Sequence, residues 1–196
     1  DFLHTYEQPY HRGIRMRPGV VPPADALDAI PWAKHACYLP LESRCGAHPL
    51  HEAGAYYLQE PSALSAVSAL DPRPGERVLD LCAAPGGKST QIADALCGEG
   101  LLVCNEPVPS RAQILSRNIE RMGVRNAVVV SAMPAQLAPH FEAFFDRILV
   151  DAPCSGEGMF RRQPEARDEW SENSPRGCAD RQMEILHEAA KMLSPG

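Results

Sequence analysis

The stretch from Val78 to Thr90 constrains the fold of this chain more than any other. A short apolar run, Arg77 to Leu81, leads into a tight Ala-Pro-Gly-Gly turn, and apolar positions over Lys88 to Leu96 are then spaced for one helix face. A buried strand, a glycine turn and a helix packed on a sheet form the first unit of a doubly wound nucleotide-type site. Gly86 and Gly87 lack Cβ atoms, so the backbone there can approach a ligand closely.

Two familiar phosphate-binding motifs do not match this turn. A P-loop requires glycine where Cys82 stands, and the dinucleotide fingerprint Gly-x-Gly-x-x-Gly is absent. An ordinary strand-to-helix turn without a ligand is the remaining alternative, and a Gly-Gly pair alone would favour it. The residues that follow along the chain favour a ligand site.

Strands and helices continue to alternate after the turn. Apolar runs typical of buried strands cover Leu101 to Asn105, Asn126 to Val130 and Phe145 to Val150. A helix is expected from Ser110, as its capping residue, to Met122. This alternation predicts an α/β fold with a doubly wound, Rossmann-like parallel sheet and helices on both faces.

Functional side chains follow these strands at their carboxyl ends, where sheets of this kind bind ligands. Glu106 stands roughly 20 residues after the glycine turn, which suits a hydrogen bond to ribose hydroxyls better than a solvated strand end. Asp151 and Cys154 follow the fourth strand in Asp-Ala-Pro-Cys-Ser-Gly. A cysteine in a polar loop on this rim is a candidate reactive thiol, although a single cysteine is often a small buried hydrophobe.

The first 60 residues give weaker signals. Gly13 to Arg17 alternates like a strand, and Ala24 to Ile30 suggests a short helix. A further helix face is suggested by Phe2, Leu3 and Tyr6. The basic cluster Arg12, Arg15 and Arg17 is interpreted equally well as a solvated strand edge or as a phosphate contact. His48 and His51 have no third ligand at a useful spacing, so no metal site is predicted.

Composition limits the classes of function. The hydrophobic fraction is 44%, as in globular proteins, and no apolar run reaches the ~18 residues of a membrane span. The seven cysteines are odd in number and form no Cys-x-x-Cys pair, which indicates reduced thiols and a cytoplasmic location rather than zinc or disulfides. A net charge of −6 disfavours a large nucleic-acid surface but not a local basic groove or a basic partner domain.

Both ends resemble cut points. Residue 1 is Asp1, and the chain stops in a Ser194-Pro195-Gly196 turn of the kind that leads into another element. We therefore expect this chain to be a fragment of a longer protein.

The motifs resemble those of the Sun/Fmu (nucleolar-protein/Sun) family of S-adenosylmethionine-dependent RNA cytosine-5 methyltransferases, of the bacterial ribosomal-RNA type. The most specific are Leu-Cys-Ala-Ala-Pro-Gly-Gly-Lys, ending at Lys88, and Asp-Ala-Pro-Cys-Ser-Gly, beginning at Asp151. Further matching segments are Gly13 to Arg15, Gly54 to Ser62, Asn105-Glu106, Met159 to Pro164, Trp170 and Arg181-Gln182. The resemblance extends over nearly the whole chain.

The resemblance implies a class I methyltransferase sheet over residues 61–196, truncated at its C-terminal end, and a small RNA-binding-type α/β domain with a linker over residues 1–60. It also implies S-adenosyl-L-methionine as cofactor and an RNA substrate, ribosomal RNA. No membrane partner is expected, and although the sequence does not determine the oligomeric state, a monomer is expected. The loop that would wrap the methionine part of the cofactor consists of Cys82, Ala83, Ala84, Pro85, Gly86, Gly87 and Lys88, and Glu106 would hold its ribose.

The chemistry of the family explains which side chains it needs. Carbon 5 of cytosine is a poor nucleophile, and a thiolate that adds to carbon 6 makes it able to accept a methyl group. A carboxylic acid near N3 and the exocyclic amine stabilises the adduct. By resemblance Asp151 has this role and also lies near the methyl donor, while Lys88 lies close to the donor and the base.

Two departures from the family pattern stand out. Many members carry an aspartate that holds the adenine where this chain has Met133, so the adenine contact must come from elsewhere, such as Ser131, backbone or apolar packing. The attacking thiol of the family lies in a Thr-Cys motif that would follow Gly196. By resemblance Cys154 is then the second cysteine, which helps to release the product, and residues 1–196 alone are expected to be inactive.

Other classes of protein remain possible. A DNA cytosine-5 methyltransferase would use Cys154 itself as nucleophile, but the glycine turn and the Arg-rich Phe160 to Arg162 loop fit the RNA family better. An amino-methyltransferase motif is broken by Ala152 and Cys154. A non-catalytic cofactor-binding or assembly module is the third alternative. The sequence does not identify the RNA or the cytosine.

Overall fold

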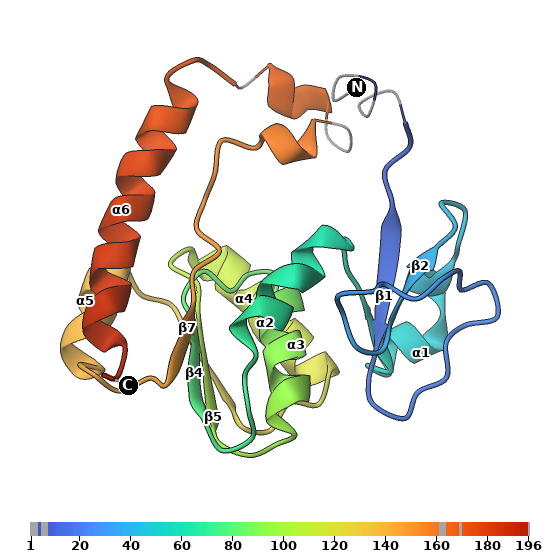
Figure 1. The fold of residues 1–196 in the computed structure, drawn as a ribbon, viewed down its shortest axis with the longest axis horizontal. Coiled ribbons are helices and arrows are strands. Elements are labelled where there is room, and N and C mark those ends of the chain that lie inside the picture. The colour runs from blue at the N-terminus through green and yellow to red at the C-terminus, as the bar shows by residue number, and fades with distance from the viewer. Residues whose placement is uncertain (1–3, 5–7, 161–163, 169, 196) are drawn as a thin grey trace.

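A computed structural model describes residues 4, 8–160, 164–168 and 170–195 (Figure 1). The first part of the chain contains an antiparallel sheet in the order β2-β1-β3, formed by β1 (Arg12–Met16), β2 (Ala36–Leu39) and β3 (Tyr56–Leu58). The second part contains a parallel sheet in the order β6-β5-β4-β7. Its strands are β4 (Arg77–Asp80), β5 (Leu101–Asn105), β6 (Ala127–Val130) and β7 (Arg147–Leu149).

Helices cover both faces of the parallel sheet, which confirms the predicted fold class (Figure 1). Helices α2 (Ser65–Leu70), α3 (Gly87–Leu96) and α4 (Pro109–Arg121) lie on one face, and α5 (Pro134–Leu137) and α6 (Ser174–Met192) lie on the other. A short helix, α1 (Pro49–Glu52), belongs to the N-terminal part. Single 3-10 turns cover Cys45–Ala47, Ser62–Leu64, Ala138–His140, Glu157–Met159 and Pro164–Arg167.

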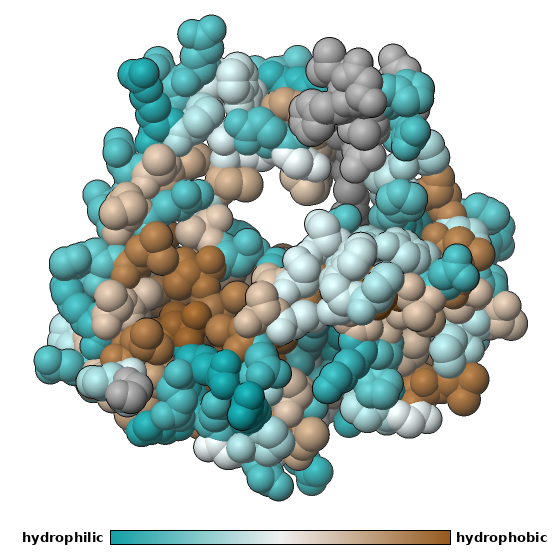
Figure 2. Space-filling view, in the orientation of Figure 1, coloured by the Kyte–Doolittle hydropathy of each residue, from teal (hydrophilic) through white to brown (hydrophobic). Residues whose placement is uncertain are grey.

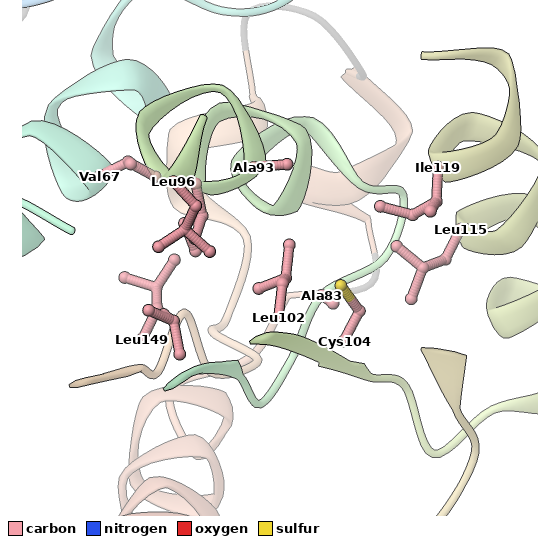
Figure 3. Packing of buried hydrophobic residues seen from close by; sticks show 11 residues of the cluster. Val67, Ala83, Ala93, Leu96, Leu102, Cys104, Leu115, Ile119 and Leu149 are labelled. Atoms are coloured by element: carbon pink, nitrogen blue, oxygen red, sulfur yellow. The ribbon is translucent and has the colours of Figure 1, made fainter. Parts of the chain in front are cut away.

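The alternation of side chains along the strands divides the core into two layers. Leu102 points to the first face, toward Leu96 of α3 and Leu115 of α4 (Figure 3). Val78 and Ile92 belong to the same buried cluster. The second layer joins neighbouring strand positions to α5 and α6, and its buried members are Leu79, Leu81, Val103, Leu137, Ala138, Phe145, Ile185, Ala189 and Met192. Strands buried on both faces explain the near-continuous apolar runs in the sequence.

Several predictions of secondary structure are wrong, either in the residue at which a helix begins or in the type of structure. The helix after β5 starts with Pro109 at its first position and has Val108 as N-cap, so Ser110 lies inside the helix and does not cap it. Proline suits that first position because its fixed φ is helical and its missing N–H has no partner there. Residues Ala24 to Ile30 form turns rather than a helix, and Ile30 is tied to Ala36 by a backbone hydrogen bond. The suggested helix face of Phe2, Leu3 and Tyr6 lies outside the described residues.

Within the basic cluster of the N-terminal part, Arg15 lies neither on a solvated strand edge nor in a position to contact phosphate. This side chain is 2% exposed, forms an ion pair with Asp94 of α3 and donates to Thr90 Oγ1 at 2.7 Å. Burial lowers the pKa of Arg15 to about 10. Arg12 instead donates to the carbonyl oxygens of Leu41 and Ser43. The buried arginine therefore fastens β1 to the helix that follows the glycine turn.

A second contact between the two parts of the chain involves α4. Arg121 donates to the carbonyl oxygens of His51 at 2.6 Å and Tyr56 at 3.4 Å, and its guanidinium carbon lies 5.4 Å from the centre of the Tyr57 ring. Gly54 approaches the same region so closely that a Cβ atom there would overlap the carbonyl oxygen of Arg121. The φ of Gly54 is +68°, a conformation that other residues rarely adopt.

We expect Gly54→Ala to lower the free energy of unfolding by about 3 kcal/mol, because it adds both backbone strain and overlap with Arg121. Gly19→Ala is the matched control: its φ is +85° and nothing lies within 4 Å of the added atom, so strain alone should cost about 1 kcal/mol. Urea unfolding of both variants measures the difference. Equal losses would show that the contact with Arg121 contributes nothing.

No helix in the described ranges is long and apolar enough to cross a membrane. The described residues also contain no group of three or more His, Cys, Asp or Glu side chains arranged to hold a metal ion.

Candidate active site

The carboxyl ends of β4, β5 and β7 open into a pocket of about 980 Å³. Cys82, Glu106 and Asp151 line it from these three strand ends, and Cys154 lines it from the loop after β7. Further lining residues come from the start of α5 and from α6, including Met133, Arg181, Met183 and Ile185. The sequence predicted that residues of this rim lie together, and the structure places them around one pocket.

Apolar side chains border this pocket on its α6 side. In the space-filling view the face is hollowed, and hydrophobic residues gather beside the hollow (Figure 2). Met183 is 67% exposed and Met133 is 58% exposed, while Val108 at the start of α4 is also exposed. A pocket with apolar walls and a few polar groups at one end is typical of sites for small organic ligands.

Buried polar side chains at the ends of β4 and β5 hold the glycine turn in place. Asp80, the last residue of β4, is fully buried and accepts a hydrogen bond from Ser89 Oγ at 2.7 Å. Asn105 donates from Nδ2 to the Leu81 carbonyl at 3.1 Å, and its own carbonyl accepts from the amide of Ala83 at 2.8 Å. Burial raises the pKa of Asp80 to about 6.

The two glycines of the turn serve different contacts. Gly86 is the N-cap of α3 with φ +111°, a conformation that glycine adopts without strain. A Cβ on Gly87 would lie 3.2 Å from Tyr57 Cε1 and 3.3 Å from Gln59 Cδ. Glycine at position 87 therefore lets the N-terminal part pack directly on the start of α3, where backbone amides of the first turn have no helical partner.

Glu106 is a buried carboxylate at the pocket wall. It is 2% exposed and accepts a hydrogen bond from the backbone amide of Val108 at 3.0 Å. Arg111, in the first turn of α4, lies 3.4 Å from it and also donates to the carbonyl of Ala84 at 3.2 Å. Arg111 thus links the carboxylate to the glycine turn, and sequence reasoning missed it; its position shortly after Glu106 on the predicted helix was the available signal.

Lys88 and Asp151 form an ion pair across the site. Lys88 Nζ donates to Asp151 Oδ2 at 2.6 Å, joining the first turn of α3 to the loop that follows β7. The Lys88 side chain is 19% exposed and that of Asp151 is 56% exposed. The carboxylate therefore keeps free surface for a further partner.

The cysteines near the pocket differ in their surroundings. Cys154 is exposed, as a thiol that meets a substrate must be. Cys82 is partly buried, and burial together with nearby Asp80 and Glu106 raises the pKa of its thiol to about 11. Burial also raises the pKa of Cys104. Of these three cysteines, Cys154 is the one whose environment favours reaction with a ligand.

Three other features of the sequence analysis remain, and the structure describes two of them. Met133 lines the pocket as the N-cap of α5, consistent with a contact through apolar surface. The two arginines of the loop after Cys154, Arg161 and Arg162, lie outside the described residues. His48 caps α1 by accepting from the amide of Leu50, which accounts for one of the two histidines without a metal.

Comparison with known proteins identifies relatives over the whole chain. Residues 67–196 match the family model described as 16S rRNA methyltransferase RsmB/F, and residues 1–61 match the N-terminal domain of 16S rRNA methyltransferase RsmF. Ribosomal RNA small subunit methyltransferase F of Serratia proteamaculans is 36% identical over 100% of this chain and 44% of its own length. The protein of the same name from Escherichia fergusonii is 35% identical with the same coverage. The chain thus spans about half the length of these curated relatives.

Solved structures agree with these matches. A methyltransferase homologue from Pyrococcus horikoshii is 28% identical, with a TM-score of 0.82 over 98% of this chain and 64% of that chain. NSun6 from Pyrococcus horikoshii, solved with SFG, is 29% identical, with a TM-score of 0.70 over 81% of this chain and 39% of that chain. The resemblance found from the motifs is confirmed: this chain belongs to the RsmB/F family of 16S rRNA methyltransferases.

Proposed function

We propose that this chain is the part of an RNA methyltransferase that transfers a methyl group from S-adenosyl-L-methionine to carbon 5 of a cytosine in ribosomal RNA, through a covalent cysteine adduct. The observation that carries the proposal is the meeting of Glu106, Asp151 and Cys154 around one pocket at the carboxyl edge of the sheet, with Lys88 in an ion pair with Asp151. The relatives, which are methyltransferases of small-subunit ribosomal RNA, support the substrate class.

S-adenosyl-L-methionine is the cofactor, and the residues present fit it. The buried Glu106 carboxylate accepts hydrogen bonds and suits the ribose hydroxyls. The loop from Cys82 to Lys88 would wrap the methionine part, since it leads into the first turn of α3, where backbone amides have no helical partner. Met133 and Val108 offer apolar surface for the adenine, where the family resemblance implies an acid. The bound cofactor supplies the activated methyl group.

The remaining steps belong to the base and to side chains of the protein. A cysteine thiolate adds to carbon 6 of the cytosine, and carbon 5 then takes the methyl group while S-adenosylhomocysteine leaves. A general base takes the proton from carbon 5, the electrons of that C–H bond form the C5–C6 double bond, and the thiolate leaves carbon 6 with the electrons of the C–S bond, which restores the aromatic ring. Asp151, which accepts a hydrogen bond from Lys88 at 2.6 Å, would contact N3 and the exocyclic amine and stabilise the adduct.

We assign Cys154 to the release step. Its exposure in the loop after β7 allows it to reach the base, but the resemblance places the attacking thiol in another motif. The alternative, a DNA cytosine-5 methyltransferase type of reaction with Cys154 as nucleophile, is also compatible with an exposed thiol on this rim. The two assignments predict opposite behaviour of a Cys154 variant.

Incubation of the full-length protein with S-adenosyl-L-methionine carrying a labelled methyl group and with unmodified small-subunit ribosomal RNA tests the proposal. We expect label in RNA, at 5-methylcytosine after nuclease digestion and mass spectrometry. Label at another atom of cytosine, or in DNA alone, would overturn it. Binding of the cofactor without transfer to RNA would favour the non-catalytic module.

A further inference from the structure

The loop that carries Cys154 has no regular secondary structure. Residues 150–156 form neither helix nor strand, and the loop then enters the 3-10 turn Glu157–Met159 (Figure 1). No backbone–backbone hydrogen bond joins residues 151–155 to another described residue. A group that reacts with one atom of a substrate needs a defined position, since a displacement of about 1 Å can cost about a hundredfold in rate. Side chains must therefore hold this loop in place.

Gln182 of α6 holds the residue before Cys154. Its Nε2 donates to the Pro153 carbonyl oxygen at 2.9 Å. Three residues further along α6, and so on the same face of the helix, Ile185 is 9% exposed and packs in the second core layer. The ring of Pro153 also restricts its own φ. The hydrogen bond thus ties the loop to a packed helix directly before the thiol.

Glu157 holds the residue after Cys154. Ser155 Oγ donates to the Glu157 carboxylate and lies 2.7 Å from each of its two oxygens. Trp170 Nε1 donates to Glu157 Oε1 at 2.8 Å. The hydrogen bonds from Ser155 and Trp170 hold the pKa of Glu157 below its usual range, so the carboxylate is charged at neutral pH. Hydrogen bonds to a charged acceptor are among the strong ones in proteins.

We propose that Gln182 and Glu157 are positioning residues, which hold the loop on both sides of Cys154 so that its thiol reaches the base during product release. The inference rests on the proposed function and on the assignment of Cys154 to the release step. Neither side chain lines the large pocket, whereas Cys154 does, so both act through the loop and not on the base. Their hydrogen bonds go to the two neighbours of Cys154 and leave the thiol exposed.

The test measures methyl transfer and release separately in the full-length protein. Gln182→Met keeps the length of the side chain but cannot donate to Pro153. In a single turnover with labelled S-adenosyl-L-methionine and unmodified small-subunit ribosomal RNA, we expect methyl transfer at the wild-type rate. Steady-state turnover should fall about ten- to hundredfold, and a denaturant-resistant protein–RNA adduct should accumulate, because elimination is slowed. A purely structural role would instead lower the rates of transfer and turnover alike.

Two variants of Glu157 test the other side of the loop. Glu157→Leu removes the acceptor of Ser155 and should give the same slow release with an accumulated adduct. Glu157→Gln keeps an oxygen that can accept from Ser155, so its turnover should lie within about threefold of wild type. Gln113→Met is the control for Gln182→Met: Gln113 is exposed on α4 and does not line the large pocket, so turnover should not change.

Wild-type turnover in Gln182→Met or in Glu157→Leu overturns the inference for that residue. Equal losses of the transfer rate and of turnover, without an adduct, overturn it for both residues. A lower rate of adduct formation has the same consequence, because it would make Cys154 the attacking thiol. Failure of the wild type to form 5-methylcytosine contradicts the proposed function itself and is seen before any variant is compared.

Discussion

Replacing Glu106 with alanine is expected to weaken binding of S-adenosyl-L-methionine by about one hundredfold. The carboxylate is 2% exposed and stands at the end of β5, so a ribose that hydrogen-bonds to it does so away from competing water. Hydrogen bonds to a charged group contribute about 1.5–3 kcal/mol each, and 1.4 kcal/mol corresponds to a tenfold change in affinity. Isothermal titration calorimetry on the full-length protein measures the loss.

Two further variants separate this effect from damage to the fold. Glu106→Gln keeps an oxygen that can accept from the Val108 amide, so it should preserve the start of α4 and weaken binding by about tenfold. Glu184→Ala removes an exposed carboxylate from the α6 wall of the same pocket and should leave affinity unchanged. Unchanged affinity in Glu106→Ala, or equal losses in Glu106→Ala and Glu184→Ala, would contradict the ribose assignment.

The parallel half of the fold could be predicted because its signals are local. Strand β5 has the predicted bounds, Leu101–Asn105, and β4 and α3 differ from their predicted bounds by one residue each. Parallel strands end at one edge of a sheet, so the order of elements was enough to bring Glu106 and Asp151 to one rim. Side chains that directly follow the strands could therefore be predicted to be neighbours, although no long-range contact was known.

The N-terminal part could not be predicted in the same way, because its contacts join distant residues. Arg15 is buried and forms an ion pair with Asp94, 79 positions away in the sequence. No local sequence pattern distinguishes it from the half-exposed Arg12. The strand β3 has three residues, too short to show a period. Gln59 lies against Gly87, a contact that depends on how the two parts of the chain meet.

Replacing Cys154 with alanine is expected to trap the full-length enzyme on its RNA. If Cys154 serves in release, attack on carbon 6 still proceeds from another cysteine, the methyl group is transferred, and elimination then stalls. The result is a protein–RNA adduct that resists denaturant and retards the protein on a gel with labelled RNA. Wild type should show almost none at steady state, because release follows transfer. The motivation is the exposed thiol in the Asp-Ala-Pro-Cys-Ser-Gly loop beside Asp151.

The cysteines of the chain itself provide the control for this assignment. Cys82 lines the same pocket, but burial raises the pKa of its thiol to about 11, so it is a poor nucleophile. A double variant with Cys82→Ala and Cys154→Ala should therefore still form the adduct expected of Cys154→Ala alone. A protein of residues 1–196 should form no adduct with or without Cys154, since the attacking thiol is proposed to lie outside it. A gel shift given by residues 1–196 and abolished by Cys154→Ala would reverse the assignment and make Cys154 the nucleophile, as in the DNA type of enzyme.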